Sequence, residues 1–199
     1  MSYNNSRPRR RRRKYVRPFV AFLAAAIVVT AGFFAFRHFY NDVFYPVKYS
    51  EYVEKYAAMH GLDTEFVYAV IHSESGFDPN AVSSADAKGL MQIMDDTFEW
   101  LQTKDDTDEV FSADRLFDPE INIKYGTLLL QLNMESYYYK QEVLVAYHQG
   151  RRQLQNWLDN PDISADGAKL DHIPSSVTKA YVDNVFKAEQ KYKEIINKE

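Results

Sequence analysis

Apolar side chains recur at three- and four-residue steps along most of the chain after residue 48, which is the spacing of one face of an α-helix. The clearest run is residues 63–75, in which Phe66 and Val70 belong to such a face. Asp63 can cap the start of this run, and Gly76 can end it. The pattern therefore predicts a helix over 63–75.

Breakers and caps divide the rest of the sequence into further helical segments. Gly61 ends a pattern that begins near Ser50, and Asp118-Pro119 supplies an N-cap and a first helical residue for a long segment. No stretch alternates as a half-buried strand would, and no repeat of 20–50 residues is visible. The sequence thus predicts an all-α domain, whose other helices are expected at about 50–60, about 95–102, from 119 onward, 141–148, 151–159, and from 175 or 176 to about 195.

The N-terminal part has a different pattern. Residues 19–36 are 18 consecutive uncharged residues in which Thr30 is the only hydroxyl. At 1.5 Å per residue a helix of this length spans about 27 Å, close to the hydrocarbon thickness of a bilayer. A buried core helix would normally keep a polar face, so we predict a transmembrane helix.

Eight cations precede Pro18 with no acid among them, and they indicate the orientation of this helix. Basic flanks stay cytoplasmic, so the rest of the chain is expected on the outer side of the cell membrane. A cleaved signal peptide is the alternative, but it would have a shorter apolar region and a small-residue cleavage site. This run ends instead in bulky residues and Arg37, which favours an uncleaved single-pass anchor.

These features divide the chain into four predicted parts. A basic cytoplasmic tail at 1–18 precedes the anchor at 19–36, a short linker follows at 37–47, and a folded domain occupies 48–199.

Composition and charge narrow the function classes of the folded domain. With 46% hydrophobic and 15% aromatic residues in 199 positions, the chain can bury the core of one domain. It has no cysteine for a disulfide or a Cys-based metal site, and its five histidines lack zinc-binding spacing, so we expect no metal or cofactor. Residues 38–199 hold all 28 acids but only 15 of the 24 basic residues, a formal charge of −13 that argues against nucleic-acid binding.

Glu74 is the strongest candidate for a chemical role. It lies in the last turn of the predicted helix 63–75, where the helix macrodipole disfavours a negative charge. Partial burial would also disfavour the charged form, so both effects raise the pKa of the carboxyl group. A carboxylic acid that keeps its proton near neutral pH can act as a general acid.

Five ordered sequence blocks carry a family resemblance over about residues 48–190. They resemble the soluble lytic transglycosylases, lysozyme-like bacterial enzymes that cleave the glycan strands of peptidoglycan. The blocks are Glu74-Ser75-Gly76-Phe77-Asp78-Pro79 with Ala81 and Ser83, Gly89-Leu90-Met91-Gln92-Ile93-Met94, Phe117-Asp118-Pro119 with Asn122 and Gly126, Ala146-Tyr147-His148-Gln149-Gly150, and Ile173-Pro174 with Thr178, Tyr181 and Val182.

The resemblance implies a lysozyme-like, goose-type helical domain with a cleft between two lobes, and peptidoglycan glycan strands as its partner. In the family one glutamate, here Glu74, protonates the glycosidic oxygen between N-acetylmuramic acid and N-acetylglucosamine. It then takes the proton of the C6 hydroxyl, which closes a 1,6-anhydro ring without water. The positions that match substrate contacts of the family are Ser83, Gln92, Met94, Tyr147, His148 and Tyr181.

Two departures from the family pattern leave alternatives open. Asp86 stands where the family generally has Gly, and it is either a turn residue or a second carboxylate that would allow hydrolysis, as in goose-type lysozymes. His148 and Gln149 replace the family's Asn and Ala, which changes the expected sugar contacts. The alternatives to a lytic transglycosylase are therefore a hydrolytic muramidase and, less favoured because the acid is retained, a catalytically silent glycan-binding scaffold.

Overall fold

The computed structural model describes residues 13–105, 107 and 109–197, and it divides the chain into two units, 1–44 and 45–199. The described residues of the first unit form one long helix, α1, at Arg13–Phe44. Most of the predicted basic tail at 1–18 lies outside the described residues.

Helix α1 contains a segment, Pro18–Phe44, that is long and apolar enough to cross a membrane. Its large side chains are exposed, Phe22 and Val29 among them. Residues 37–44 of the predicted linker are the last turns of this helix, so only residues 45–49 separate α1 from the next helix.

The second unit is helical, as predicted, and its described residues contain no strand beyond two isolated bridges that pair Lys88 with Val82 and Ile93. Its helix boundaries agree closely with those expected, and a short 3₁₀ helix, η1, was not predicted. The elements are α2 (Ser50–Met59), α3 (Thr64–Ser75), α4 (Asp95–Gln102), η1 (Ala113–Phe117), α5 (Pro119–Ser136), α6 (Lys140–Gln149), α7 (Arg151–Leu158) and α8 (Ser176–Ile196).

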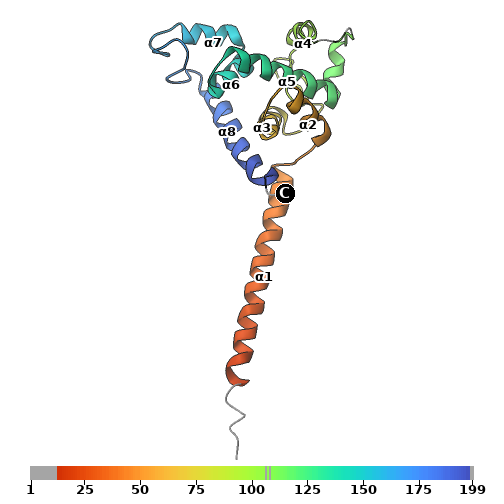
Figure 1. Ribbon diagram of the computed structural model, residues 1–199, viewed down its shortest axis with the longest axis vertical. Coiled ribbons are helices and arrows are strands. Elements are labelled where there is room, and N and C mark those ends of the chain that lie inside the picture. The colour runs from red at the N-terminus through yellow and green to blue at the C-terminus, as the bar shows by residue number, and fades with distance from the viewer. Residues whose placement is uncertain (1–12, 106, 108, 198–199) are drawn as a thin grey trace, which may run out of the picture. The chain divides into compact units, whose positions relative to one another are not determined.

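Helix α3 is the centre of the core. Its residues 66–71 are all buried, so this stretch is enclosed on every side rather than on one face. Its most extensive contact is with α8 and it also packs on α2 (Figure 1). Burying a side chain such as Phe66 stabilises the fold by about 2–3 kcal/mol. The helix that carries Glu74 is therefore a rigid element.

Of the two predicted N-caps, the one at Asp118 forms and the one at Asp63 does not, and Ser175 also caps a helix, α8. Asp118 accepts a hydrogen bond from the Glu120 amide at 3.0 Å, and Ser175 accepts one from the Thr178 amide at 3.2 Å. Asp63 precedes α3 but makes no side-chain cap, because its carboxylate lies 3.5 Å from the Lys140 ammonium.

The segment 45–49 packs against the core of the second unit. The Tyr45 ring stacks on His72 of α3, with ring centroids 5.0 Å apart and an interplanar angle of 6°. The Tyr192 hydroxyl on α8 donates to the Pro46 carbonyl at 3.2 Å. The first residues after α1 are thus attached to both α3 and α8.

Candidate active site

A cleft of about 420 Å³ lies at the C-terminal end of α3, a volume typical of ligand sites. Its lining comes from the end of α3, residues 83–97, one side chain of α5 and residues 147–150. Six of the seven predicted site residues line it: Glu74, Ser83, Gln92, Met94, Tyr147 and His148. Ile93, Thr97 and Leu129 also line it, and the sequence pattern did not predict them.

Glu74 is half-buried in the last turn of α3. Burial raises the pKa of its carboxyl group to about 7, and Tyr181 offsets part of that rise. The Tyr181 hydroxyl acts on Glu74 at close range, but it has no hydrogen bond of ordinary length and angle to any described residue. Glu74 can therefore hold or release a proton near neutral pH.

Two tyrosines surround this carboxyl group and stay protonated. Burial, and secondarily the negative charge of Glu74, raises the pKa of both Tyr147 and Tyr181 well above the usual range. The Tyr147 hydroxyl donates to the Met91 carbonyl at 2.7 Å. Tyr147 therefore also holds the turn at 89–92, whose Gln92 lines the cleft together with Glu74.

Asn122 of α5 fixes that turn, a role that the sequence pattern did not assign. Its amide oxygen accepts from the Met91 amide at 2.7 Å, and its amide nitrogen donates to the carbonyls of Lys88 and Leu116 at 2.9 and 2.8 Å. A Cβ at Gly89 would stand 2.2 Å from the Leu116 carbonyl oxygen, so only glycine fits beside this network. Because Asn122 is fully buried, these bonds set the position of the whole turn.

Two further contacts seat the turn between α3 and α5. The Ser75 hydroxyl, adjacent to Glu74, donates to the Leu90 carbonyl at 2.8 Å. A Cβ at Gly126 would stand 2.3 Å from the Met91 sulfur, so the glycine makes room for that side chain. The motif glycines thus serve close packing near the acid.

Gln92 and Ser83 line the cleft but are partly engaged by the protein itself. The Gln92 amide nitrogen donates to the carbonyls of Ala81 and Gly89 at 3.1 and 2.9 Å. The Ser83 hydroxyl accepts from the backbone amide of Ala87 at 3.1 Å. Both side chains therefore stabilise the loop, and their capacity to bind a sugar is smaller than the motifs suggest.

Met94 and His148 also line the cleft, and no side-chain hydrogen bond to another described residue is found for either. Met94 is 47% exposed, so its apolar side chain is accessible to a ligand there. His148 is half-buried, and burial lowers the pKa of its imidazole. Its ring stacks on Tyr181, the one predicted site residue that does not line the cleft. Tyr181 therefore lies directly behind a lining residue.

Glu74 is the one carboxylate among the described residues that line the cleft. Asp86 is exposed and absent from that lining, and its φ of 60° lies in the left-handed region that Asp tolerates in turns. The described residues also contain no group of three or more His, Asp and Glu side chains close enough to hold a metal ion. The geometry thus agrees with Asp86 as a turn residue.

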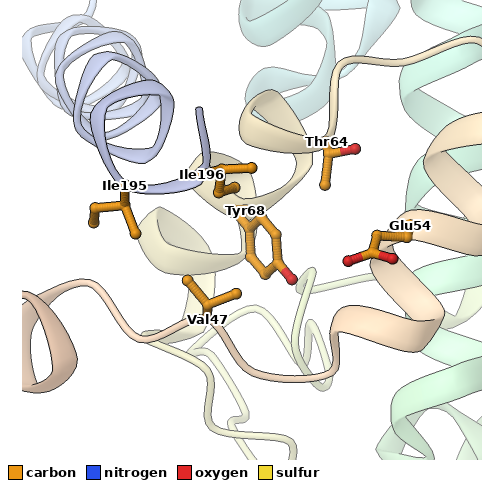
Figure 2. Close-up of a pocket in the computed structure, with 6 residues that line it drawn as sticks. All are labelled: Val47, Glu54, Thr64, Tyr68, Ile195 and Ile196. Atoms are coloured by element: carbon orange, nitrogen blue, oxygen red, sulfur yellow. The ribbon is translucent and has the colours of Figure 1, made fainter. Parts of the chain in front are cut away.

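A second cavity, of about 140 Å³, lies between α2, α3 and the end of α8 and shares no lining residue with the cleft. Figure 2 shows the aliphatic side chains of Val47, Ile195 and Ile196 on one side of the Tyr68 ring and Glu54 on the other. The Tyr68 oxygen is itself inaccessible, so the cavity offers few polar groups to a ligand.

The helical order and the cleft at the end of α3 define a lysozyme-like domain. Residues 51–168 match the family model of the Transglycosylase SLT domain, and the chain belongs to this family. The resemblance read from the sequence blocks and the predicted fold class are both confirmed.

Relatives and solved structures agree with this assignment. The chain is 30% identical over 156 residues to the soluble lytic murein transglycosylase of Escherichia coli K12, covering 75% of this chain but 23% of the relative. It is 38% identical over 92 residues to the membrane-bound lytic murein transglycosylase C of Yersinia pestis, covering 45% of this chain and 25% of that one. The chain thus spans about a quarter of the length of these relatives.

Two solved structures show the same fold over most of the chain. An inactive Glu-to-Gln variant of the lytic transglycosylase Slt from Pseudomonas aeruginosa gives a TM-score of 0.69 at 24% identity, over 79% of this chain and 26% of that one. The 70-kDa soluble lytic transglycosylase of Escherichia coli in complex with bulgecin A gives 0.68 at 26% identity, over 76% and 25%.

Proposed function

We propose that this protein is a membrane-anchored peptidoglycan lytic transglycosylase in which Glu74 serves as both acid and base. The observation that carries the proposal is a single half-buried carboxyl group in the described cleft lining, with a pKa of about 7. Lytic murein transglycosylases are also the relatives that match the chain, and a Glu-to-Gln change inactivates the Pseudomonas protein.

The reaction needs one carboxyl group in two protonation states. Protonated Glu74 gives its proton to the oxygen that joins C1 of N-acetylmuramic acid to N-acetylglucosamine, and the C1–O bond breaks. The resulting carboxylate removes the proton of the C6 hydroxyl, whose oxygen bonds to C1 and closes the 1,6-anhydro ring. Glu74 is then protonated again, and no water is consumed.

A hydrolytic muramidase is the second candidate. Inverting and retaining hydrolases typically place a second carboxylate about 5 to 9.5 Å from the acid. Asp86 was the candidate for that group, and its exposed position outside the cleft lining favours the one-carboxylate reaction.

The remaining site residues receive roles from their surroundings. We assign Met94 to an apolar contact with a sugar ring, and Ser83 and Gln92 to hydrogen bonds with substrate in addition to those within the loop. Tyr147 and Tyr181 flank Glu74 and exclude water from its carboxyl group. His148 lines the cleft from the end of α6.

The N-terminal helix supplies the proposed anchor. Residues 19–36 would cross the bilayer, with 1–18 in the cytoplasm and the domain at 48–199 outside. The apolar helix and a membrane-bound relative support attachment to a membrane. The chain lacks cysteine, so single Asn5→Cys and Lys104→Cys variants can report topology. A membrane-impermeant maleimide should label intact cells at residue 104 and not at residue 5.

Product chemistry tests the activity itself. Full-length protein in detergent micelles is incubated with purified cell-wall sacculi, and the released muropeptides are analysed by mass spectrometry. We expect 1,6-anhydro ends, which are 18 Da lighter than reducing ends because no water is added. Reducing ends in the same assay would establish the muramidase instead, and no release would leave only the glycan-binding scaffold.

A further inference from the structure

His148 and Gln149, the two residues that depart from the family pattern at the end of α6, both reach across to α8. The His148 ring stacks on Tyr181 with centroids 4.4 Å apart and an interplanar angle of 12°. The Gln149 amide nitrogen donates to the Thr178 hydroxyl at 2.6 Å. Thr178 and Tyr181 are buried and lie one turn apart on α8. Adjacent residues of α6 therefore hold a single turn of α8.

We propose that these two contacts form a clamp that positions Tyr181 against Glu74, and that His148 and Gln149 are positioning residues rather than only sugar ligands. The term clamp here means the His148–Tyr181 stack together with the Gln149–Thr178 hydrogen bond. The kinetic part of this inference rests on the proposed function, because it assumes that Glu74 is the acid.

The need for a clamp follows from how Tyr181 is held. Among the described residues its hydroxyl has one close polar contact, with Glu74, and that contact lies outside ordinary hydrogen-bond geometry. The orientation of the ring therefore depends mainly on packing, and a stacked aromatic partner stabilises such a ring beyond its burial. The Asn of the family pattern has no ring to stack. His148 therefore supplies a contact that the family residue cannot make.

The position of Tyr181 matters because it sets the surroundings of Glu74. Burial is the main cause of the raised Glu74 pKa, and Tyr181 is the one side chain that acts on that carboxyl group by a close polar contact. If the ring moved away, the carboxyl group would lose both the burial that raises its pKa and the Tyr181 contact that lowers it, and burial is the larger effect, so the pKa would fall. The clamp thus keeps water away from the carboxyl group and holds its pKa near 7.

The test compares three clamp variants with one matched control in the full-length protein in detergent micelles. His148→Ala removes the stack, His148→Phe keeps a ring, and Gln149→Ala removes the hydrogen bond. His60→Ala is the control, because His60 is also half-buried and its Nδ1 lies 2.9 Å from Thr127, outside the cleft lining. Two quantities are measured: kcat and KM on glycan strands, and the Glu74 pKa by NMR titration of ¹³C-labelled carboxyl groups.

We expect His148→Ala to lower kcat about tenfold while KM changes less than about twofold, since about 1.4 kcal/mol corresponds to a factor of ten. His148→Phe should recover most of that loss, and Gln149→Ala should lower kcat about threefold. The Glu74 pKa should fall by about one pH unit in His148→Ala and stay near 7 in His60→Ala.

Two results would overturn the clamp. A change in KM alone, with rescue by His148→Asn and not by His148→Phe, would make His148 a sugar ligand. An unchanged Glu74 titration in both His148→Ala and Gln149→Ala would contradict the positioning role directly. The titration needs no turnover, so it judges the clamp even if the protein proves unable to cleave glycan.

Discussion

Two buried or half-buried acidic side chains at helix α8 have opposite electrostatic surroundings. In its C-terminal half, Glu189 is 2% exposed and lies 2.9 and 2.7 Å from the ammonium groups of Lys140 and Lys193. In its N-terminal half, Tyr181 faces Glu74, and no ion pair to Glu74 is found among the described residues. Glu189 is held in ion pairs, whereas Glu74 has no cation of the described chain beside it and burial raises the pKa of its carboxyl group. The first arrangement serves stability and the second is available for chemistry.

The largest expected effect comes from removing the carboxyl group of Glu74. Glu74→Gln keeps the shape of the side chain but can neither give nor take a proton. We expect glycan cleavage to fall by at least about 10²–10⁴-fold, while the unfolding midpoint in urea stays the same or rises. Glycan cleavage is measured by mass spectrometry of the released muropeptides. The unfolding midpoint is measured by circular dichroism during a urea titration. Near wild-type release by this variant would remove Glu74 from the mechanism.

The next largest effect is expected on the pH dependence of stability and of catalysis, which Glu74 should dominate. The Glu74 pKa of about 7 in the folded protein lies above its ordinary value of 4.5, so the folded state holds a proton that the unfolded state has lost. Stability should therefore fall as pH rises from about 4.5 to 7, by roughly 1–3 kcal/mol, and the acid step should slow about tenfold per pH unit above 7. Urea titrations and initial rates from pH 4 to 9 test this, with Glu74→Gln as the control that should lose the stability slope.

Glu189→Gln should show the reverse of Glu74→Gln. The amide cannot neutralise Lys140 and Lys193, and both ammonium groups keep partial access to water, so the cost is limited. We expect a loss of about 2 kcal/mol in the free energy of unfolding and a kcat within about twofold of wild type. A large drop in kcat without loss of stability would contradict the division between the two regions.

The smallest effect is expected at Asp86. Its φ of 60° lies in the left-handed region, which Asp tolerates but Gly adopts at lower cost, so Asp86→Gly should stabilise the fold by up to about 1 kcal/mol. The muropeptide ends should remain anhydro. If the wild type forms reducing ends that this variant lacks, Asp86 is a working second carboxylate and Glu74 does not act alone.

The helices could be predicted because their signals are local. Gly76 ends α3 in the left-handed conformation, and Asp118 caps α5, as breakers and caps indicate from sequence alone. The position of Glu74 at a helix end follows from the same pattern. Two effects were expected to raise its pKa, the helix macrodipole and burial, and burial is the one found to do so.

Contacts between residues far apart in the chain could not be predicted from local signals. Asn122 bonds to the backbone of Met91 and Lys88, more than thirty residues away, and nothing in the helical period of α5 points to that partner. The same holds for His148, whose stacking on Tyr181 depends on how α6 meets α8. Gln92 is a related case, because its motif suggests a substrate contact and does not reveal the two loop carbonyls it binds.

The attachment of residues 45–49 has a mechanical consequence. Tyr45 stacks on His72 of α3, and the Pro46 carbonyl accepts a hydrogen bond from Tyr192 of α8. A pull on residues 45–49 would therefore be transmitted first to these two helices. One of them is the helix that carries Glu74.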